Sequence, residues 1–449
     1  MRLRASPRRQ STMSRIPRLL LPHIAVVVIV VVTDAFSPGA SSTLVNLSPA
    51  VDRGDVYAMS EWAANYGGVQ QAGGVGLTSY DGYDYFQATQ LDMPAGTCIT
   101  YVPSDLVISS SKALREFGKT LSSCEKRLTK AGVSPDAVPL FRVFFKILAE
   151  YEKGDQSPWF PWLDSLPKSY NNGASMTYDC FDILPPYASY CAMQDRLNLL
   201  NFQKAVRPLG GPSEAPFGPN VLEDEEVLKW AYNVARTRSI EADGDCFIAP
   251  MCDMFNHGAN PEAEVTYDPN TGDCYAYAII DVPAGSPLRI SYSDPTNTTP
   301  LFANYGFLDD SAPGTFCKLL NMLKEMEELG YGFSDLLFYK DGDISPGVYD
   351  VVLYHVLKKG DDPGLAQGFY QATMNGDVST KAQYQEIYWP YTKEELLNHV
   401  NGMIDDIERS ARTARSYDLN THPRVPLILQ HNSFVRDTFV QVKSYLDNM

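Results

Sequence analysis

The sequence predicts an α+β fold in which regions of short β-strands alternate with long helical regions. Short strand-like stretches, punctuated by Gly and Pro, lie between residues 67 and 103, and strand-like sequence returns between residues 246 and 280. Residues 111–239 instead show the spacing of hydrophobic residues that is typical of helices, and residues 310–449 are again mostly helical. We therefore expect small β-sheets, a helical insert between their strands and a mostly α-helical C-terminal region.

Length and composition favour several folded units and argue against nucleic acid as a partner. The chain has 449 residues, which exceeds the size at which a single hydrophobic core keeps growing. Hydrophobic residues make up 44% and charged residues 20%, as in globular proteins. A formal net charge of -17 repels phosphate backbones and favours a cationic partner, such as a lysine-bearing protein.

The eight cysteines are scattered along the chain and form no C-x-x-C pair. Their spacing therefore gives no zinc site, and we expect no metal. An even number of cysteines would allow disulfides, but single cysteines in a large domain are more often buried thiols. Buried thiols are the prediction, and disulfides are the alternative.

The N-terminal segment has the pattern of a targeting sequence. Two arginines precede an apolar run over residues 19–32, and a cleavage site follows at Ala35, which predicts a signal peptide over residues 1–35. The hydroxylated, acid-poor sequence that follows resembles the transit portion of algal plastid presequences, so residues 36–55 are interpreted as a transit peptide or linker. We expect a plastid location, with secretion as the alternative and no stable membrane association after the presequence is removed.

Several local signals mark helix ends. Ser134 followed by Pro135 predicts a helix start, with serine as the N-cap. A second helix is expected over residues 223–237 because its first turn is acidic. Thr392 and Glu395 form a capping-box signature, which predicts another helix start at that point.

The most informative residues lie in three short motifs between positions 253 and 307. In order, the motifs are Asp253-Met-Phe-Asn256-His257, Ser291-Tyr292-Ser293-Asp294 and Asn304-Tyr305-Gly306-Phe307. Each motif alone is weak, but their order and the spacing from Tyr292 to Tyr305 are hard to obtain by chance. Together they resemble the C-terminal half of a SET methyltransferase domain of the Rubisco large-subunit lysine methyltransferase type.

Two earlier segments extend this resemblance. Gly74-Val75-Gly76-Leu77 is similar to the glycine turn of the family, and Thr237-Arg238-Ser-Ile is similar to its S-R-x-F element. The resemblance implies SET-type small β-sheets with a knot-like C-terminal threading. It also implies domain boundaries, with the SET domain split into residues 56–110 and 231–309, a helical insert over 111–230, and a helical domain like the family's substrate-binding domain over 310–449.

The resemblance further implies S-adenosyl-L-methionine as the methyl donor and a role for each matching residue. Tyr292 would be catalytic, because a tyrosine hydroxyl is a poor base but a good dipole toward the transferring methyl group. The donor would be bound by Gly74, Val75, Gly76, Asn256, His257 and Tyr305. The substrate would contact Arg238, Asp253 and Phe307. For each side chain the alternative is a structural role, such as core packing for the aromatic residues or a charge at a helix C-terminus for Arg238.

The sequence and this resemblance together predict a donor-dependent protein-lysine N-methyltransferase that acts on a soluble plastid protein with an accessible lysine. Rubisco and a sugar-phosphate aldolase are the family-level candidates for that substrate. Gly258, Ile240 and Ser293 depart from the residues usual in the family. These departures leave open a SET-like binding module without turnover, and a histidine-directed methyltransferase is a further alternative.

Overall fold

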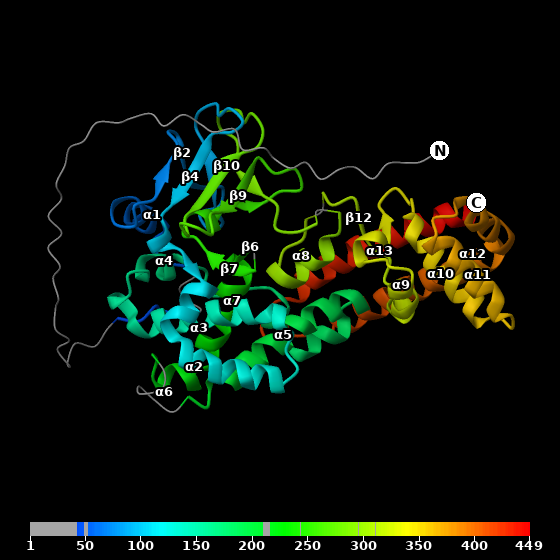
Figure 1. Ribbon diagram of the computed structural model, residues 1–449, viewed down its shortest axis with the longest axis horizontal. Coiled ribbons are helices and arrows are strands. Elements are labelled where there is room, and N and C mark those ends of the chain that lie inside the picture. The colour runs from blue at the N-terminus through cyan, green and yellow to red at the C-terminus, as the bar shows by residue number, and fades with distance from the viewer. Residues whose placement is uncertain (1–42, 49–52, 210–215, 243, 295, 310) are drawn as a thin grey trace. The chain divides into compact units, whose positions relative to one another are not determined.

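The computed structural model describes residues 43–48, 53–209, 216–242, 244–294, 296–309 and 311–449. The signal peptide predicted over residues 1–35 lies outside the described residues, as does most of the segment 36–55. The predicted alternation of strand regions and helical regions is confirmed within the described chain (Figure 1).

Two small sheets join strands from before and after the helical region. One has the strand order β1 (Gln70–Gln71), β4 (Cys98–Val102), β10 (Cys274–Ala278) and β9 (Ala263–Tyr267). The other has the order β5 (Ile108–Ser109), β7 (Asp245–Ile248) and β6 (Ile240–Ala242). In the first sheet Cys274 pairs with Val102, so residues far apart in the sequence lie side by side. The helical region is therefore inserted between strands of common sheets.

The other strands form pairs. The strands β2 (Val75–Ser79) and β3 (Tyr85–Thr89) are antiparallel, as are β12 (Gly314–Phe316) and β13 (Leu337–Tyr339). The strands β8 (Asn256–His257) and β11 (Arg289–Ile290) pair in parallel. This parallel pair is important for the site because it brings the Asn-His motif beside the segment that carries Tyr292.

The helices before residue 240 pack around one large hydrophobic core. They are α1 (Val56–Asn65), α2 (Ser110–Lys130), α3 (Val138–Lys153), α4 (Phe160–Ser165), α5 (Pro186–Val206), α6 (Pro219–Glu223) and α7 (Glu225–Arg238). Ser134 caps a short 3-10 turn that leads into α3, close to the predicted start. The ring centroid of Phe141 on α3 lies 5.1 Å from that of Phe202 on α5. Such fully buried aromatic side chains each stabilise the fold by about 2 kcal/mol.

The C-terminal region is helical, as predicted. Helix α8 (Thr298–Tyr305) precedes this region, whose helices are α9 (Leu323–Glu328), α10 (Pro346–Lys359), α11 (Pro363–Met374), α12 (Val378–Ala414) and α13 (Val425–Asn448). Buried residues of α10, α12 and α13, such as Val352, Val400 and Phe439, form a second hydrophobic core. This core is separate from the one that supports the sheets.

The helix start predicted at Thr392 is wrong. Helix α12 begins at Val378, where the side chain of Asp377 accepts a hydrogen bond from the backbone N–H of Thr380 at 3.0 Å. Thr392 is buried inside the helix, and its Oγ1 donates to the carbonyl of Tyr388 at 3.1 Å. Because α12 packs along α10, α11 and α13, tertiary contacts maintain the helix through Pro390 and outweigh the local capping signal.

All eight cysteines are free, and six of them are buried. The prediction of buried thiols is therefore confirmed, and the disulfide alternative is wrong.

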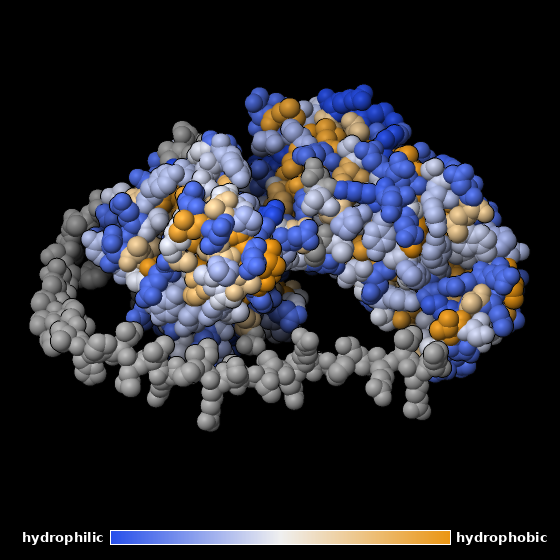
Figure 2. All heavy atoms as spheres, turned by 90° about the horizontal axis from the view of Figure 1, so that it is seen from above, coloured by the Kyte–Doolittle hydropathy of each residue, from blue (hydrophilic) through white to orange (hydrophobic). Residues whose placement is uncertain are grey.

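Hydrophilic residues predominate on the face shown in Figure 2, with smaller hydrophobic groups between them. Among the residues that the structure describes, no helix combines the length and the hydropathy needed to cross a bilayer.

Lys318 is a buried lysine that lies two residues after β12, in the segment between β12 and β13. Its Nζ donates to Thr299 Oγ1 at 3.0 Å and lies 4.9 Å from the ring centroid of Tyr187, and no carboxylate of the described chain pairs with it. Burial lowers the pKa of Lys318 from 10.5 to about 7. Between these two pH values the folded protein binds fewer protons here than the unfolded chain, so this lysine destabilises the fold more as the pH falls.

We expect Lys318→Met to raise the free energy of unfolding at pH 7 by ~3 kcal/mol, because methionine fills similar space without a charge to desolvate. The gain should shrink toward pH 10, where the unfolded lysine also loses its proton. Chemical denaturation at both pH values measures it, with the exposed Lys324→Met on α9 as the control. An equal gain at the two pH values would contradict the lowered pKa.

Candidate active site

Two cavities of the described chain share Tyr292 and Tyr305 in their walls. The first, about 640 Å³, runs between β6 and β9 and is called the β6–β9 cleft. The second, about 440 Å³, contains Asn256 and His257 in its wall and is called the Asn256–His257 cavity. Both cavities also include Thr237, Arg238 and Asp253 in their lining. These shared side chains therefore form a wall common to the β6–β9 cleft and the Asn256–His257 cavity.

Four aromatic rings cluster where the cavities meet. The ring centroid of Tyr292 lies 4.8 Å from that of Tyr305, 5.5 Å from that of His257 and 6.3 Å from that of Phe307. His257 and Phe307 are in turn 5.9 Å apart. The faces of such rings attract cations, and the rings exclude water. The cluster therefore suits a positively charged group that must react away from solvent.

Tyr292 is held by two hydrogen bonds. Its Oη donates to the carbonyl of Phe255 at 2.7 Å, and its backbone N–H donates to Nδ1 of His257 at 3.1 Å. The parallel pairing of β8 with β11 produces this contact, because it sets His257 opposite Ile290, two residues before the tyrosine. Burial raises the pKa of Tyr292, although the nearby guanidinium of Arg238 opposes the shift. The hydroxyl therefore stays protonated and acts as a fixed dipole.

His257 has a defined protonation pattern. Its Nδ1 accepts a hydrogen bond, so the remaining proton of the neutral ring is on Nε2, which lies 3.5 Å from Oδ2 of Asp309. Burial lowers the pKa of His257, while Asp309 opposes that shift. His257 is therefore an orienting group for Tyr292 rather than a general base.

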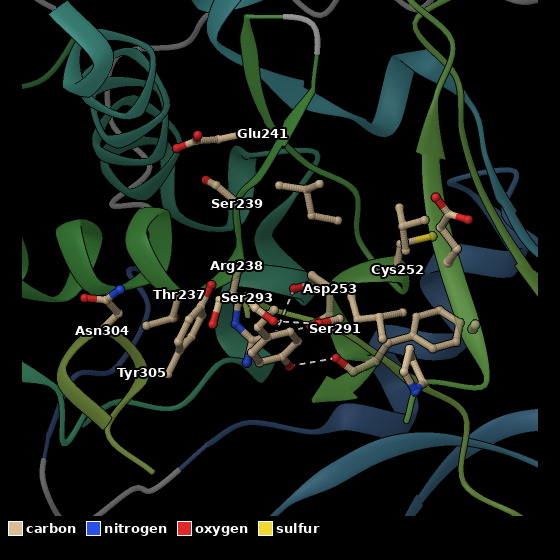
Figure 3. A pocket seen from close by; sticks show the side chains of 18 of the residues that line it. Thr237, Arg238, Ser239, Glu241, Cys252, Asp253, Ser291, Ser293, Asn304 and Tyr305 are labelled. Carbon is tan, nitrogen blue, oxygen red and sulfur yellow. Dashed lines mark hydrogen bonds and ion pairs between the residues drawn. The ribbon is translucent and has the colours of Figure 1, made fainter. Parts of the chain in front are cut away.

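A buried ion pair joins Arg238 and Asp253. Arg238 is the last residue of α7, and its Nη1 donates to Oδ2 of Asp253 at 2.9 Å and to the backbone carbonyl of Asp253 at 3.1 Å. Nε1 of Trp162 donates to the same Oδ2 at 2.9 Å. The carboxylate is fully buried, and burial works against the charge of Arg238, yet Asp253 raises the pKa of the guanidinium. Figure 3 shows the pair beside Tyr305.

The turn that carries Asp253 is strained. Met251 has a φ of 76°, which is unfavourable for a residue with a Cβ and costs about 1–3 kcal/mol. Within the turn, the backbone N–H of Asp253 donates to the carbonyl of Ala249 at 3.0 Å. The buried side chain of Gln87, on β3, donates to the carbonyl of Met251 at 3.1 Å. Contacts from a distant strand therefore hold this turn in place.

Several buried polar atoms around the two cavities have no hydrogen-bond partner within the described residues. These atoms are Arg238 Nε, Asp253 Oδ1, Ser239 Oγ and Tyr170 Oη. A buried polar group without a partner destabilises a protein by about 1–3 kcal/mol, so native structures contain few of them. Their concentration here favours a site that is completed by a polar ligand.

Comparisons with known proteins agree with this geometry. No protein-family model matches the chain. SET domain-containing protein 4 of Homo sapiens is 21% identical over 239 residues, which are 50% of this chain and 52% of that protein. The protein of the same name from Mus musculus is 24% identical over 154 residues, or 31% of this chain and 35% of that protein. The chain thus spans about half, or less, of the length of the curated relatives it matches.

Two solved structures resemble the chain over most of its length. One is the SET domain of LSMT bound to lysine and AdoHcy, with a TM-score of 0.58 at 13% identity over 88% of this chain and 91% of that one. The other is Rubisco LSMT bound to AdoMet, with a TM-score of 0.58 at 14% identity and the same coverage. The chain has the SET fold of the LSMT type.

The SET fold brings seven of the predicted site residues together. They are Arg238, Asp253, Asn256, His257, Tyr292, Tyr305 and Phe307. Phe307, which was predicted to contact the substrate, lies in the Asn256–His257 cavity and not in the lining of the β6–β9 cleft. It therefore shares a cavity with the residues predicted to bind the donor.

The glycine motif lies apart from these residues. Gly74, Val75 and Gly76 stand at the start of β2, outside the lining of both cavities. Gly74 has a φ of 82°, and a Cβ at this position would lie 2.8 Å from Leu91 Cγ. The turn and the close approach of Leu91 both require a glycine here, whereas donor binding by these three residues stays a prediction.

One departure from the family pattern has a local cause in this SET fold. A Cβ at Gly258 would lie 3.0 Å from Cβ and 3.1 Å from Nε of Arg289. Arg289 is itself fixed by an ion pair with Glu262 at 2.5 Å. Because the arginine fills the space that a serine side chain would need, glycine at this position is explained by packing.

Some residues that were not predicted from the sequence reach the site from distant segments. Arg53, just before α1, lines the Asn256–His257 cavity, where its Nη1 donates to the carbonyl of Tyr83 at 3.2 Å and its guanidinium lies 5.5 Å from the ring centroid of Tyr85. Tyr170 lines the same cavity. Burial and the charge of Arg238 lower the pKa of Arg53. The tyrosine-rich stretch after β2, which contains Tyr83 and Tyr85, was the sequence signal available for this side of the cavity. No motif surrounds Arg53.

We expect Asp253→Asn to lower the free energy of unfolding by about 3 kcal/mol, because it leaves the charge of Arg238 buried and unpaired. Urea denaturation at neutral pH measures the change. The double variant Asp253→Asn/Arg238→Gln should recover part of the loss, since it removes both charges.

The control for this prediction is Asp437→Asn, which breaks an exposed pair with Arg436 at 3.2 Å. An exposed pair contributes at most about 1 kcal/mol. Equal losses for Asp253→Asn and Asp437→Asn would show that the buried pair has no special role in stability.

Proposed function

We propose that this protein is an S-adenosylmethionine-dependent protein methyltransferase that modifies a lysine of another protein. The observation that carries the proposal is the pair of cavities that meet at Tyr292 and its aromatic neighbours. One cavity suits the donor and the other suits a side chain that enters from a second protein. The resemblance to LSMT structures bound to AdoMet and to lysine supports this assignment.

The Asn256–His257 cavity is proposed to hold the donor, which supplies an electrophilic methyl group on a sulfonium. The four-ring cluster favours a cation at the point where the cavities meet. Arg53, whose Nη1 donates to the carbonyl of Tyr83 in the wall of this cavity, would bind the donor's carboxylate. The unpartnered Nε of Arg238 offers a further donor of hydrogen bonds.

The β6–β9 cleft is proposed to admit the lysine. Methyl transfer requires a neutral amine, and an amine beside Tyr292 would have its pKa lowered by burial among the rings and by the like charge of the donor's sulfonium. The Tyr292 hydroxyl, fixed by its bond to the Phe255 carbonyl, would orient the amine by its dipole. Positioning in a site without water then provides most of the acceleration.

We also propose a plastid location and an abundant soluble plastid protein as the substrate, with Rubisco and a sugar-phosphate aldolase as candidates. The presequence pattern over residues 1–55 supports the location. The net charge of -17 favours a substrate with a cationic surface around the target lysine.

Tyr292→Phe keeps the ring but removes the hydroxyl. We expect labelling of plastid extract from radiolabelled S-adenosylmethionine to fall ~100-fold or more, because the fixed dipole is lost. Donor affinity, measured by calorimetry, should change little. Tyr66→Phe, at a side chain that is 86% exposed, is the matched control. Equal labelling by wild type and Tyr292→Phe would remove this residue from its proposed role.

Arg53→Gln should weaken the binding of S-adenosylmethionine and of its demethylated product ~10-fold or more, because a hydrogen bond to a charged group is lost. Methylthioadenosine, which lacks the amino acid portion, should bind both proteins equally. Arg115→Gln, at an exposed position of α2, is the control. Equal weakening for all three ligands would contradict a contact between Arg53 and the carboxylate.

A further inference from the structure

We propose that the β6–β9 cleft contains an acidic subsite, formed by Glu241 and Glu264, that accepts a basic residue next to the target lysine. This inference rests on the proposed function, and it adds a preference for the sequence around the modified residue.

Each cationic side chain in the lining of the cleft already has an acidic partner. Arg236 pairs with Asp195 at 2.8 Å, and the carboxylate of Asp195 is nearly buried. Arg238 pairs with Asp253 at 2.9 Å. The two arginines are therefore neutralised within the protein and leave no free positive charge to repel a basic ligand.

Two acidic side chains in the same lining have no such partner. Glu241 and Glu264 are exposed, and neither forms an ion pair with any described residue. Glu241 lies on β6 and Glu264 on β9, each of which is the outer strand of its sheet. Two different sheets therefore supply uncompensated negative charge to one cleft.

A buried acceptor in the same cleft points independently to a ligand. The carboxylate of Asp253 is 0% exposed, yet its Oδ1 has no hydrogen-bond partner in the described chain. Figure 3 shows Asp253, Arg238 and Tyr305 near one another and Glu241 farther away, beyond Ser239. A peptide that places its lysine beside Tyr292 would therefore extend past Glu241.

The size of the effect follows from the exposure of the two carboxylates. An exposed ion pair stabilises by about 0.2–1 kcal/mol, which corresponds to ~1.5-fold to 5-fold in affinity for each carboxylate. Two such contacts together give a preference of roughly tenfold at low salt. The preference should weaken as salt increases, because exposed charges are screened.

A lysine-centred peptide library with randomised flanks tests the subsite. The purified protein is incubated with the library and labelled S-adenosylmethionine, and the labelled peptides are sequenced. We expect Arg and Lys to be enriched ~5-fold to 10-fold at one or more flanking positions. Glu241→Gln/Glu264→Gln should lose this enrichment, and Glu241→Lys/Glu264→Lys should invert it toward acidic flanks.

The matched control is Glu327→Gln/Glu386→Gln, which makes the same charge change at exposed positions of α9 and α12. It should keep the wild-type preference. Labelling without enrichment of basic flanks, or enrichment that persists in Glu241→Gln/Glu264→Gln, would overturn the subsite and leave the proposed methyltransferase activity standing. Absence of labelling from every library member and from plastid extract would instead refute the activity, and the subsite with it.

Discussion

The buried ion pair between Arg238 and Asp253 is the constraint on which the site depends. It joins the end of α7 to the strained turn after β7, and Trp162 of α4 donates to the same carboxylate. A buried charge is tolerated only when it is paired and hydrogen-bonded, so these three segments have little freedom to move relative to one another. Because both residues line both cavities, the pair fixes the wall that the cavities share.

The position of Tyr292 follows from the same framework. The turn that holds Asp253 leads directly into Phe255, Asn256 and His257, and two of these residues accept the hydrogen bonds of Tyr292. The β8–β11 pairing involves only two residues of each strand, and it is sufficient to place Tyr292 beside His257. Short strands are sufficient here because their buried residues, such as Ile99 and Phe247, share one large hydrophobic core with the helices of the insert.

The sequence predicted the parts of the site that are carried by compact motifs. Asp253 to His257, Tyr292 and Tyr305 lie in three short motifs, and their resemblance to the SET methyltransferase motifs implied that they would meet. Arg53, Trp162 and Tyr170 could not be predicted, because distant segments bring them to the site without any local pattern. The capping signal at Thr392 misled because contacts with neighbouring helices continue α12 through it, and the glycine at position 74 is explained locally by its positive φ and by Leu91.

Charges in this protein have two different roles, and the difference is set by burial. The paired arginines near Tyr292 fix geometry, since a buried ion pair adds little net stability but is costly to break. The exposed carboxylates of Glu241 and Glu264 have no ion-pair partner among the described residues. They can therefore attract a cation over about 8–10 Å, which is the screening length at physiological salt. A net charge of -17 favours cationic partners in general, whereas unpaired carboxylates in the lining of the cleft can distinguish one basic peptide from another.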